Sequence, residues 1–459
     1  MSILYVELGL IAFFFLVLFI LFQLPPLNLI MKKSSMWEQS FYAILFFSSS
    51  FFMVERFFPD MPLRMGFLKA IILAFVLFAH PANKILTGNK YSFDRVFLLI
   101  FIFFVTGYTA VALSDYIGNR IEFDFLFFKT TQYIFYPMLA FFAYNEFKGS
   151  NGINNYVKVV LIIAIIAAVI GMIQFIAGPG WLKSIGMQLE IRSQVTYISG
   201  TASKVFRIFS ICLDHQSYAA LLLWGIICLL IISNYLKNKW ALLVLIFFLV
   251  SILTTYSNTI LGAAILILLT YVLIKFMYEK KMNVVGGLLL VSVILSVTVF
   301  TFRNAAIREG MLNPERKSYL SRFSAFNNGL TILFENPLKI HGMSEKNLNS
   351  LGTTPDCYMV WSVLQFGLVL SFLEFLLYIY PVFIMSQLLR RNKDQLPDEK
   401  KNMIYLMCSF FVVNAFFLNM SNNLMFTGPS NLIFWTMVGI TSRRSFWLSS
   451  ENKELTEAK

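Results

Sequence analysis

The 459-residue chain has little of what keeps a soluble protein in water and little of what builds a metal or disulfide centre. Charged residues make up 13% of the chain, about half of the share found in ordinary globular proteins. Only three His and four Cys are present, with no CxxC motif and no paired His spacing. A zinc site or a disulfide framework is therefore not expected, and the Cys should be reduced and packed among apolar neighbours.

Apolar residues are abundant instead. They make up 58% of the chain, 50 of them are Phe, and the mean hydropathy is +0.71. At about 20 residues per crossing, this supplies about 13 transmembrane helices. We therefore expect an all-α polytopic integral membrane protein with about 12–14 transmembrane helices, which excludes a soluble enzyme or a nucleic-acid binder despite the net charge of +13. The apolar runs are 3–24, 39–55, 65–80, 96–114, 123–144, 156–177, 209–233, 240–256, 258–278, 283–302, 358–386, 403–419 and 424–441.

The loops between these runs alternate in charge. Lys-rich loops collect on one side, which the positive-inside rule assigns to the cytoplasm, so the C-terminus is predicted inside and the N-terminus outside. No basic segment precedes the first run and no cleavage signal follows it, so this run should remain as a helix. The predicted regions are N-terminal transmembrane helices (1–178), an outer loop (179–208), central transmembrane helices (209–302), a large periplasmic loop (303–357), C-terminal transmembrane helices (358–441) and a cytoplasmic tail (442–459).

Arginine does not follow the same rule. Nine of the 14 Arg fall in the predicted outer loops: Arg56, Arg64, Arg120, Arg192, Arg207, Arg303, Arg308, Arg316 and Arg322. Arg binds carboxylates and phosphates with a planar, bidentate fork. An excess of Arg on this side indicates an anionic ligand in the outer loops. The alternative is that these Arg contact lipid phosphates at the membrane surface.

The large outer loop contains an amphipathic stretch, with apolar residues three and four positions apart between Tyr319 and Phe334. This spacing predicts a helix that lies on or just above the membrane and stops at Asn336-Pro337. Charged residues also fall within or at the edge of apolar runs: Glu7, Lys69, Lys129, Asp214, Lys275 and Glu374. Asp214 is predicted about five residues inside a helix, about 7 Å deep. It is either a functional acid or the partner of Arg207 in an ion pair that braces the helix.

Residues 205–370 carry an ordered set of motifs. They are 206–220 (FRIFSICLDHQSYAA), 253–262 (LTTYSNTILG), 321–323 (SRF), 336–338 (NPL), 341–342 (HG), 355–360 (PDCYMV) and 366–368 (FGL). This combination resembles the O-antigen polymerase and O-antigen ligase superfamily of bacterial surface-polysaccharide enzymes. The chain departs from that pattern at two places. Asn258 stands where the family usually has Arg, and Asp356-Cys357 stands where it usually has His-Asn.

The resemblance implies a fold similar to lipid-dependent (GT-C type) glycosyltransferases, with an active site facing the periplasm at the bacterial inner membrane. The implied reaction uses an undecaprenyl-diphosphate-linked glycan as donor and a second lipid-linked glycan as acceptor. Expected partners are these two glycolipids, membrane lipids and a chain-length regulator protein, with no nucleic acid and no cofactor. Arg forks would stabilise the leaving diphosphate without a metal.

The resemblance also implies roles for individual residues. Arg207 and Arg322 match the family's Arg positions and are assigned to the diphosphate, with Arg316 as a third candidate or as a contact to lipid phosphate. Asp356 takes the place of the family's His and is assigned as the general base. An apolar wall would raise the pKa of Asp356 and nearby Arg would lower it. Asp214 and His215 are the reserve base, and His341 is read as a loop residue.

The leading functional hypothesis is a polymerase that joins repeat units into O-antigen or capsular polysaccharide. A ligase that transfers glycan to lipid A-core is the alternative. The polymerase is preferred because the chain is long for a ligase and lacks the family's His. A lipid-linked-glycan flippase ranks third, because its charges should line a cavity through both halves. A transporter that carries these motif fragments by chance is a further alternative.

Overall fold

The structure is a computed structural model that describes residues 27–57, 65–147, 149–185, 208–212, 214–232, 239–255, 257–279, 317–344, 358–418 and 428–448, together with Gln23, Pro25 and the pairs 196–197 and 204–205. The predicted apolar runs 3–24 and 283–302 and the polar tail from 449 lie outside these residues. All statements below concern the described part of the chain.

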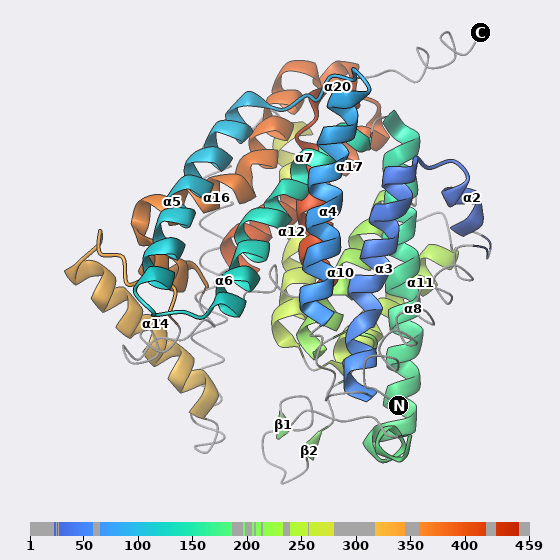
Figure 1. The fold of residues 1–459 in the computed structure, drawn as a ribbon. Coiled ribbons are helices and arrows are strands. Elements are labelled where there is room, and N and C mark those ends of the chain that lie inside the picture. The colour runs from blue at the N-terminus through green and yellow to red at the C-terminus, as the bar shows by residue number, and fades with distance from the viewer. Residues whose placement is uncertain are drawn as a thin grey trace, which may run out of the picture.

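The described residues fold almost entirely into helices (Figure 1). The α-helices are α2 (Leu27–Met31), α3 (Met36–Phe57), α4 (Met65–Leu86), α5 (Arg95–Ile117), α6 (Phe123–Thr130), α7 (Tyr136–Glu146), α8 (Gly149–Ser184), α10 (His215–Ile232), α11 (Lys239–Thr254), α12 (Asn258–Glu279), α14 (Lys317–Glu335), α16 (Tyr358–Asn392), α17 (Asp398–Val413), α19 (Gly428–Thr441) and α20 (Arg444–Leu448). Two π-helical turns, η1 (Thr131–Phe135) and η3 (Asn414–Leu418), and one 3-10 turn, η2 (Lys393–Gln395), adjoin them. Strand β1 (Thr196–Tyr197) pairs antiparallel with β2 (Lys204–Val205).

Seven of the described helices are long and apolar enough to cross a membrane. They cover 68–86, 95–117, 152–184, 215–232, 259–279, 358–392 and 398–418, and a shorter apolar helix covers 240–254. Large apolar side chains point away from the bundle: Phe75, Phe103 and Ile176 are each more than half exposed. Such surfaces fit lipid rather than water. The prediction of an all-helical polytopic membrane protein is confirmed at this level, and the total of about 12–14 spans stays a prediction.

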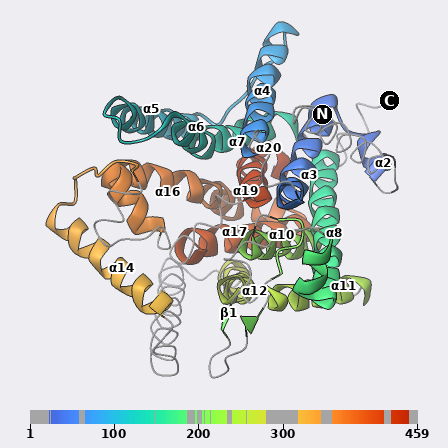
Figure 2. The ribbon, with the colours of Figure 1, turned by 60° about the horizontal axis from the view of Figure 1, so that its bottom comes forward.

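Helix α10 lies in the middle of the bundle. Its residues from Ser217 to Leu230 are all buried, because the helix is apolar on every face and packs against α8, α11, α12, α17 and α19. A helix that is apolar all round is expected to be enclosed by others. Figure 2 shows α10, α17 and α19 surrounded by the remaining helices. Residues 208–212, which precede α10 in the chain, are buried as well.

Helix ends that carry the Lys and Arg predicted to be cytoplasmic meet at one end of the bundle, near the label of α20 in Figure 1. Lys84 Nζ lies 3.0 Å from the Glu146 carboxylate. Arg443 donates to the backbone carbonyl of Tyr144 at 3.4 Å. The loops predicted to be periplasmic meet at the other end, where the Met343 amide donates to the Asp115 carboxylate. These contacts group the described loops at two ends of the bundle, and which end faces the cytoplasm stays a prediction. We call the end that holds Asp115 the outer end.

Helix α16 is broken. Gly367 has φ 78° and ψ 167°, values that no residue inside a helix adopts. Side chains sixteen positions apart, Tyr358 and Glu374, are hydrogen-bonded to each other. In a straight helix their Cα atoms would be about 24 Å apart. The two arms on either side of Gly367 must therefore fold toward each other, and the prediction of one continuous span over 358–386 is wrong in this respect.

Helix α14 confirms the predicted amphipathic helix, and it ends at Glu335, directly before Asn336-Pro337. It lies at the edge of the bundle, where Leu330 and Ile332 pack against Trp361 and its neighbours on the first arm of α16 (Figures 1 and 2). A second prediction needs correction. The apolar run 209–233 becomes helical only at His215, because 208–212 form a turn, so Asp214 precedes the helix and is not five residues inside it.

Candidate functional site

The structure describes some of the predicted site residues and not others. Arg207, Arg316 and Asp356 lie outside the described residues. Arg322 lies in the second turn of α14, but its side chain is not among those described. Asp214 and His215 are described, and both lie at the N-terminus of α10.

Asp214 caps helix α10. Its carboxylate oxygen Oδ1 accepts a hydrogen bond from the Ser217 amide at 2.7 Å, as an N-cap side chain does. The negative charge also suits the positive end of the helix dipole. His215 is the first residue of the helix and is buried. This cap gives Asp214 a structural task that the sequence pattern did not indicate, and it occupies one of the two carboxylate oxygens.

The turn that follows Arg207 is fastened to α8. The Gln174 side chain donates to the Ser210 carbonyl at 2.9 Å and accepts from the Ser210 amide at 2.8 Å. The Ser210 hydroxyl donates to the Ala167 carbonyl. Ser210 has a φ of 53°, which is unusual for a residue with a Cβ. Tertiary hydrogen bonds thus hold this segment in a conformation that its own sequence does not favour.

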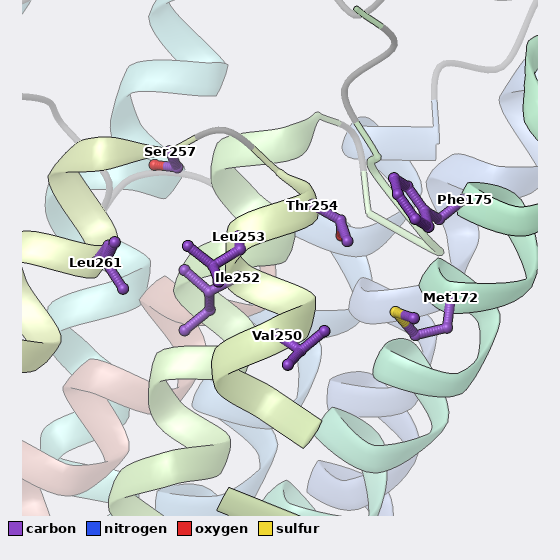
Figure 3. Close-up of a pocket in the computed structure, with 8 residues that line it drawn as sticks. All are labelled: Met172, Phe175, Val250, Ile252, Leu253, Thr254, Ser257 and Leu261. Carbon is purple, nitrogen blue, oxygen red and sulfur yellow. The ribbon is translucent and has the colours of Figure 1, made fainter. Parts of the chain in front are cut away.

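A cavity of about 400 Å³ opens beside this turn, between α8, α11 and α12 (Figure 3). Its walls are apolar, and Thr254 and Ser257 add hydroxyl groups near the turn between α11 and α12. Phe175 and Leu253 are about half exposed, so the cavity opens toward the surface that faces lipid. The lining residues are Met172, Phe175, Val250, Ile252, Leu253, Thr254, Ser257 and Leu261.

This cavity is lined by one motif that the sequence analysis singled out, and it lies beside the helix that holds another. Gln174, which holds the turn after Arg207, lies on α8 between the lining residues Met172 and Phe175. The opposite wall contains Leu253, Thr254 and Ser257, from the second motif. An apolar cavity at the outer end, with polar groups at one margin, can hold a hydrocarbon chain whose polar head lies in the outer loops.

Two further motifs meet at the break in α16. The amide of His341 donates to the Leu364 carbonyl at 2.9 Å, and the amide of Gly342 donates to the Gln365 carbonyl at 3.2 Å. The break at Gly367 frees these carbonyls from the helix, and buried carbonyls need a donor in a membrane. The 341–342 motif therefore supplies the hydrogen-bond donors that the break in the 366–368 motif requires.

Asp115 fixes the same loop from the side of α5. Its buried carboxylate accepts from the Met343 amide and pairs with Arg120, whose Nη1 lies 3.3 Å away. Of the nine predicted outer Arg, Arg120 is the one with a described side chain, and it has this structural partner. His341 is in a loop, as predicted. Burial and the charge of Lys339 lower its pKa.

The hydrogen-bonding environment of Glu374 was not predicted from the sequence. The sequence marks it only as an acid within an apolar run. In the structure it is 3% exposed and bonded to hydroxyl groups from both arms of α16. The one available sequence signal was the set of Tyr and Ser residues around the Gly in the same run. Within the described residues, no group of three or more His, Cys, Asp or Glu is arranged to hold a metal ion.

Comparison with protein-family models, with curated proteins and with solved structures gives no match to this chain.

Proposed function

We propose that this protein is a membrane glycosyltransferase of the polymerase type, similar in fold to the lipid-dependent (GT-C type) enzymes. It joins undecaprenyl-diphosphate-linked repeat units into O-antigen or capsular polysaccharide at the outer face of the bacterial inner membrane. The observation that carries the proposal is the apolar cavity at the outer end, which is lined by residues of the 253–262 motif and by Met172 and Phe175 of α8. A polyprenyl chain needs such a surface, whereas a soluble sugar substrate does not.

In the proposed reaction, the acceptor hydroxyl oxygen attacks the anomeric carbon of the donor glycan. The bond from that carbon to the diphosphate oxygen breaks, and undecaprenyl diphosphate leaves with the bonding electrons. Asp356 takes the proton of the acceptor hydroxyl. Arg207 and Arg322, with Arg316 as a third candidate, stabilise the charge on the leaving diphosphate. No step in this scheme needs a metal, so activity of the purified protein should survive EDTA.

The central test uses a deletion strain and its polysaccharide length ladder, with each variant at equal membrane abundance. Arg322→Lys should lose as much activity as Arg322→Ala, since an ammonium cannot replace the two parallel donors of a guanidinium. The loss should be about 10²–10³-fold, by analogy with removing one oxyanion donor. Asp356→Asn should abolish turnover. Lys339→Ala changes an exposed cation in the same outer loop and serves as the control.

The same ladder separates the alternatives. A single repeat unit on the core in the deletion strain supports the polymerase, and a core with no repeat unit indicates the ligase. Normal ladders from both Arg322→Lys and Asp356→Asn would overturn the proposed site. A normal ladder from Asp356→Asn alone would move the base to Asp214 or His215.

The cavity can be tested independently. Val250→Trp should fill part of it and raise the KM for the lipid-linked donor by about tenfold or more, because each buried CH₂ contributes about 0.8 kcal/mol. Val272→Trp is the matched control, since Val272 is an exposed apolar residue of α12 outside the cavity. If both variants change KM equally, the cavity does not hold the donor.

A further inference from the structure

Glu374 is a buried carboxylate held by hydroxyl groups. Both Tyr358 and Tyr378 donate to its Oε1 atom, the latter at 2.8 Å. Ser362 donates to Oε2 at 2.7 Å. Hydroxyl donors stabilise a carboxylate in the same way that backbone amides do. Each donor belongs to α16 itself, but Tyr358 and Ser362 come from the arm before Gly367, whereas Glu374 and Tyr378 come from the arm after it.

A second layer of hydroxyls completes the network. The Tyr133 hydroxyl, on the π-helical turn η1, lies 3.1 Å from the Tyr358 hydroxyl. The Ser371 hydroxyl lies 3.0 Å from the Ser362 hydroxyl. Each hydroxyl has one proton to donate and can also accept. When Glu374 is ionised, Tyr133 can donate to Tyr358 and Ser371 can donate to Ser362. Each of the five hydroxyl protons then has an acceptor, and Oε1 of Glu374 accepts two of them.

The network requires the break in α16. Ser362 and Glu374 are twelve residues apart and would be separated by about 18 Å in a straight helix. Their hydrogen bond at 2.7 Å therefore exists only because the first arm folds back at Gly367. Glu374 holds the fold-back from inside the bundle. The amides of His341 and Gly342 hold it at the break, through the carbonyls of residues 364 and 365.

This fold-back determines where the first arm begins. Tyr358 is the first residue of α16 and follows the proposed base, Asp356, by two positions. On the other side of the 345–357 segment, Met343 is fixed to Asp115. The two described residues on either side of this segment each donate a hydrogen bond to a buried carboxylate. Met343 bonds to Asp115, and Tyr358, which is nearer to Asp356 in the sequence, bonds to Glu374.

We propose that Glu374 is a positioning residue. It accepts a hydrogen bond from the Tyr358 hydroxyl and fixes the start of the first arm of α16, which follows Asp356 by two positions in the sequence. Its importance for catalysis rests on the function proposed above, whereas its hold on Tyr358 does not. Tyr358 transmits the effect, and Tyr378 stabilises the carboxylate without contributing to the position of the segment.

The test compares two tyrosines that bind the same oxygen atom. Tyr358→Phe removes the hydrogen bond that joins the start of α16 to Glu374. Tyr378→Phe removes a hydrogen bond of the same kind from the same carboxylate. In a purified polymerisation assay, Tyr358→Phe and Glu374→Gln should lower kcat about 10- to 100-fold with little change in KM, because a small misplacement of a reacting group costs this much. Tyr378→Phe should stay within about twofold of the wild type by the same criterion.

A second readout does not depend on catalysis. Cys357 adjoins Tyr358, and the other three cysteines are buried, so the rate of alkylation by a membrane-impermeant maleimide reports on the segment. Tyr358→Phe and Glu374→Gln should change this rate by several-fold, and Tyr378→Phe should leave it unchanged. If Glu374→Gln does not accumulate in the membrane, the two tyrosine variants still decide the question.

The outcomes separate this inference from the proposed function. A wild-type protein that makes no polymer, combined with an alkylation rate that only Tyr358→Phe and Glu374→Gln change, would refute the function and retain the role of Glu374 in positioning. If Cys357 is alkylated at the same rate in Tyr358→Phe and Tyr378→Phe, or is not labelled in either variant, the inference is overturned.

Discussion

Gln174 and Ser210 form a closed pair of hydrogen bonds across the outer end of the bundle. The Gln174 amide donates to the Ser210 carbonyl at 2.9 Å and accepts from the Ser210 amide at 2.8 Å. Both residues are buried. One side chain therefore satisfies both backbone polar groups of Ser210, in a turn that lies next to the apolar cavity.

This pair predicts a large cost for a substitution of similar shape. Gln174→Met should lower the free energy of unfolding by about 2–4 kcal/mol, because it leaves a backbone amide and a carbonyl buried without partners. The measurement is thermal unfolding in a fixed detergent. Gln395→Met is the control, since Gln395 is exposed, and it should leave the unfolding temperature nearly unchanged. Equal unfolding temperatures for the two variants would contradict the proposed importance of the pair.

Gly342 should tolerate no side chain. Its φ is +83°, and a Cβ there would overlap the Asp115 carboxylate, which would have to leave Met343 and Arg120. Gly342→Ala should therefore destabilise the protein by about 3 kcal/mol or more, from backbone strain and from lost hydrogen bonds.

Gly88→Ala provides the matched comparison for Gly342. Gly88 has a φ of +71°, but a Cβ at this position would have no neighbouring atom within 4 Å, so alanine there should cost only the strain of about 1–2 kcal/mol. Unfolding curves of the two variants in the same detergent measure the difference. If the two variants lose the same stability, the contact between Gly342 and Asp115 does not matter.

Glu146, at the end of α7 and beyond the predicted apolar run, should make stability depend on acid. Burial raises its pKa, but hydrogen bonds from His80, Ser35 and Lys84 outweigh burial and lower the pKa from 4.5 to about 2. Because the pKa is lower in the folded state, the stabilisation is complete above about pH 4.5 and disappears as the pH falls toward 2.

Glu146→Gln should accordingly lower the free energy of unfolding at pH 7 by at most about 3 kcal/mol, since one pKa unit corresponds to about 1.4 kcal/mol. The difference from the wild type should shrink steadily as the pH falls from about 5 to about 3. Denaturant unfolding at several pH values measures it. Glu399→Gln, at an exposed position, should show no such trend, and a constant difference for Glu146→Gln would refute the assignment.

The two ends of the bundle should face opposite sides of the membrane. Lys339 is exposed at the outer end, and the Asp398 side chain is 92% exposed at the basic end. In a Cys357→Ser background, Lys339→Cys should react with an impermeant maleimide in intact spheroplasts. Asp398→Cys should react only after the membrane is opened. The reverse pattern would place the proposed site in the cytoplasm and rule out the proposed reaction.

Much of the architecture could be predicted from local patterns. The apolar runs predicted helices that the structure contains, the Lys and Arg pattern grouped the loops that meet at each end, and the spacing within 317–335 predicted α14 and its stop at Asn336. A segment in lipid must form all of its backbone hydrogen bonds within itself, as a helix does. Its length and composition are therefore enough to identify it as a helix.

The surroundings of the candidate site could not be predicted in the same way. The position of Asp214 before α10, the tie between Gln174 and Ser210, and the network around Glu374 all depend on contacts that hydropathy does not record, most of them between residues distant in the sequence or on two sides of a break. The hydropathy of 358–386 indicated one span because Gly367 and Glu374 hardly change the average over the run.

The sequence by itself determined that this protein is a helical membrane protein, where most of its helices lie and how its charged loops are distributed. Tertiary structure alone decided which buried polar groups meet. The physical reason is that apolar segments are driven into the membrane by their own composition, whereas a buried carboxylate or amide depends on whichever partners the packing of the whole bundle brings within hydrogen-bonding distance.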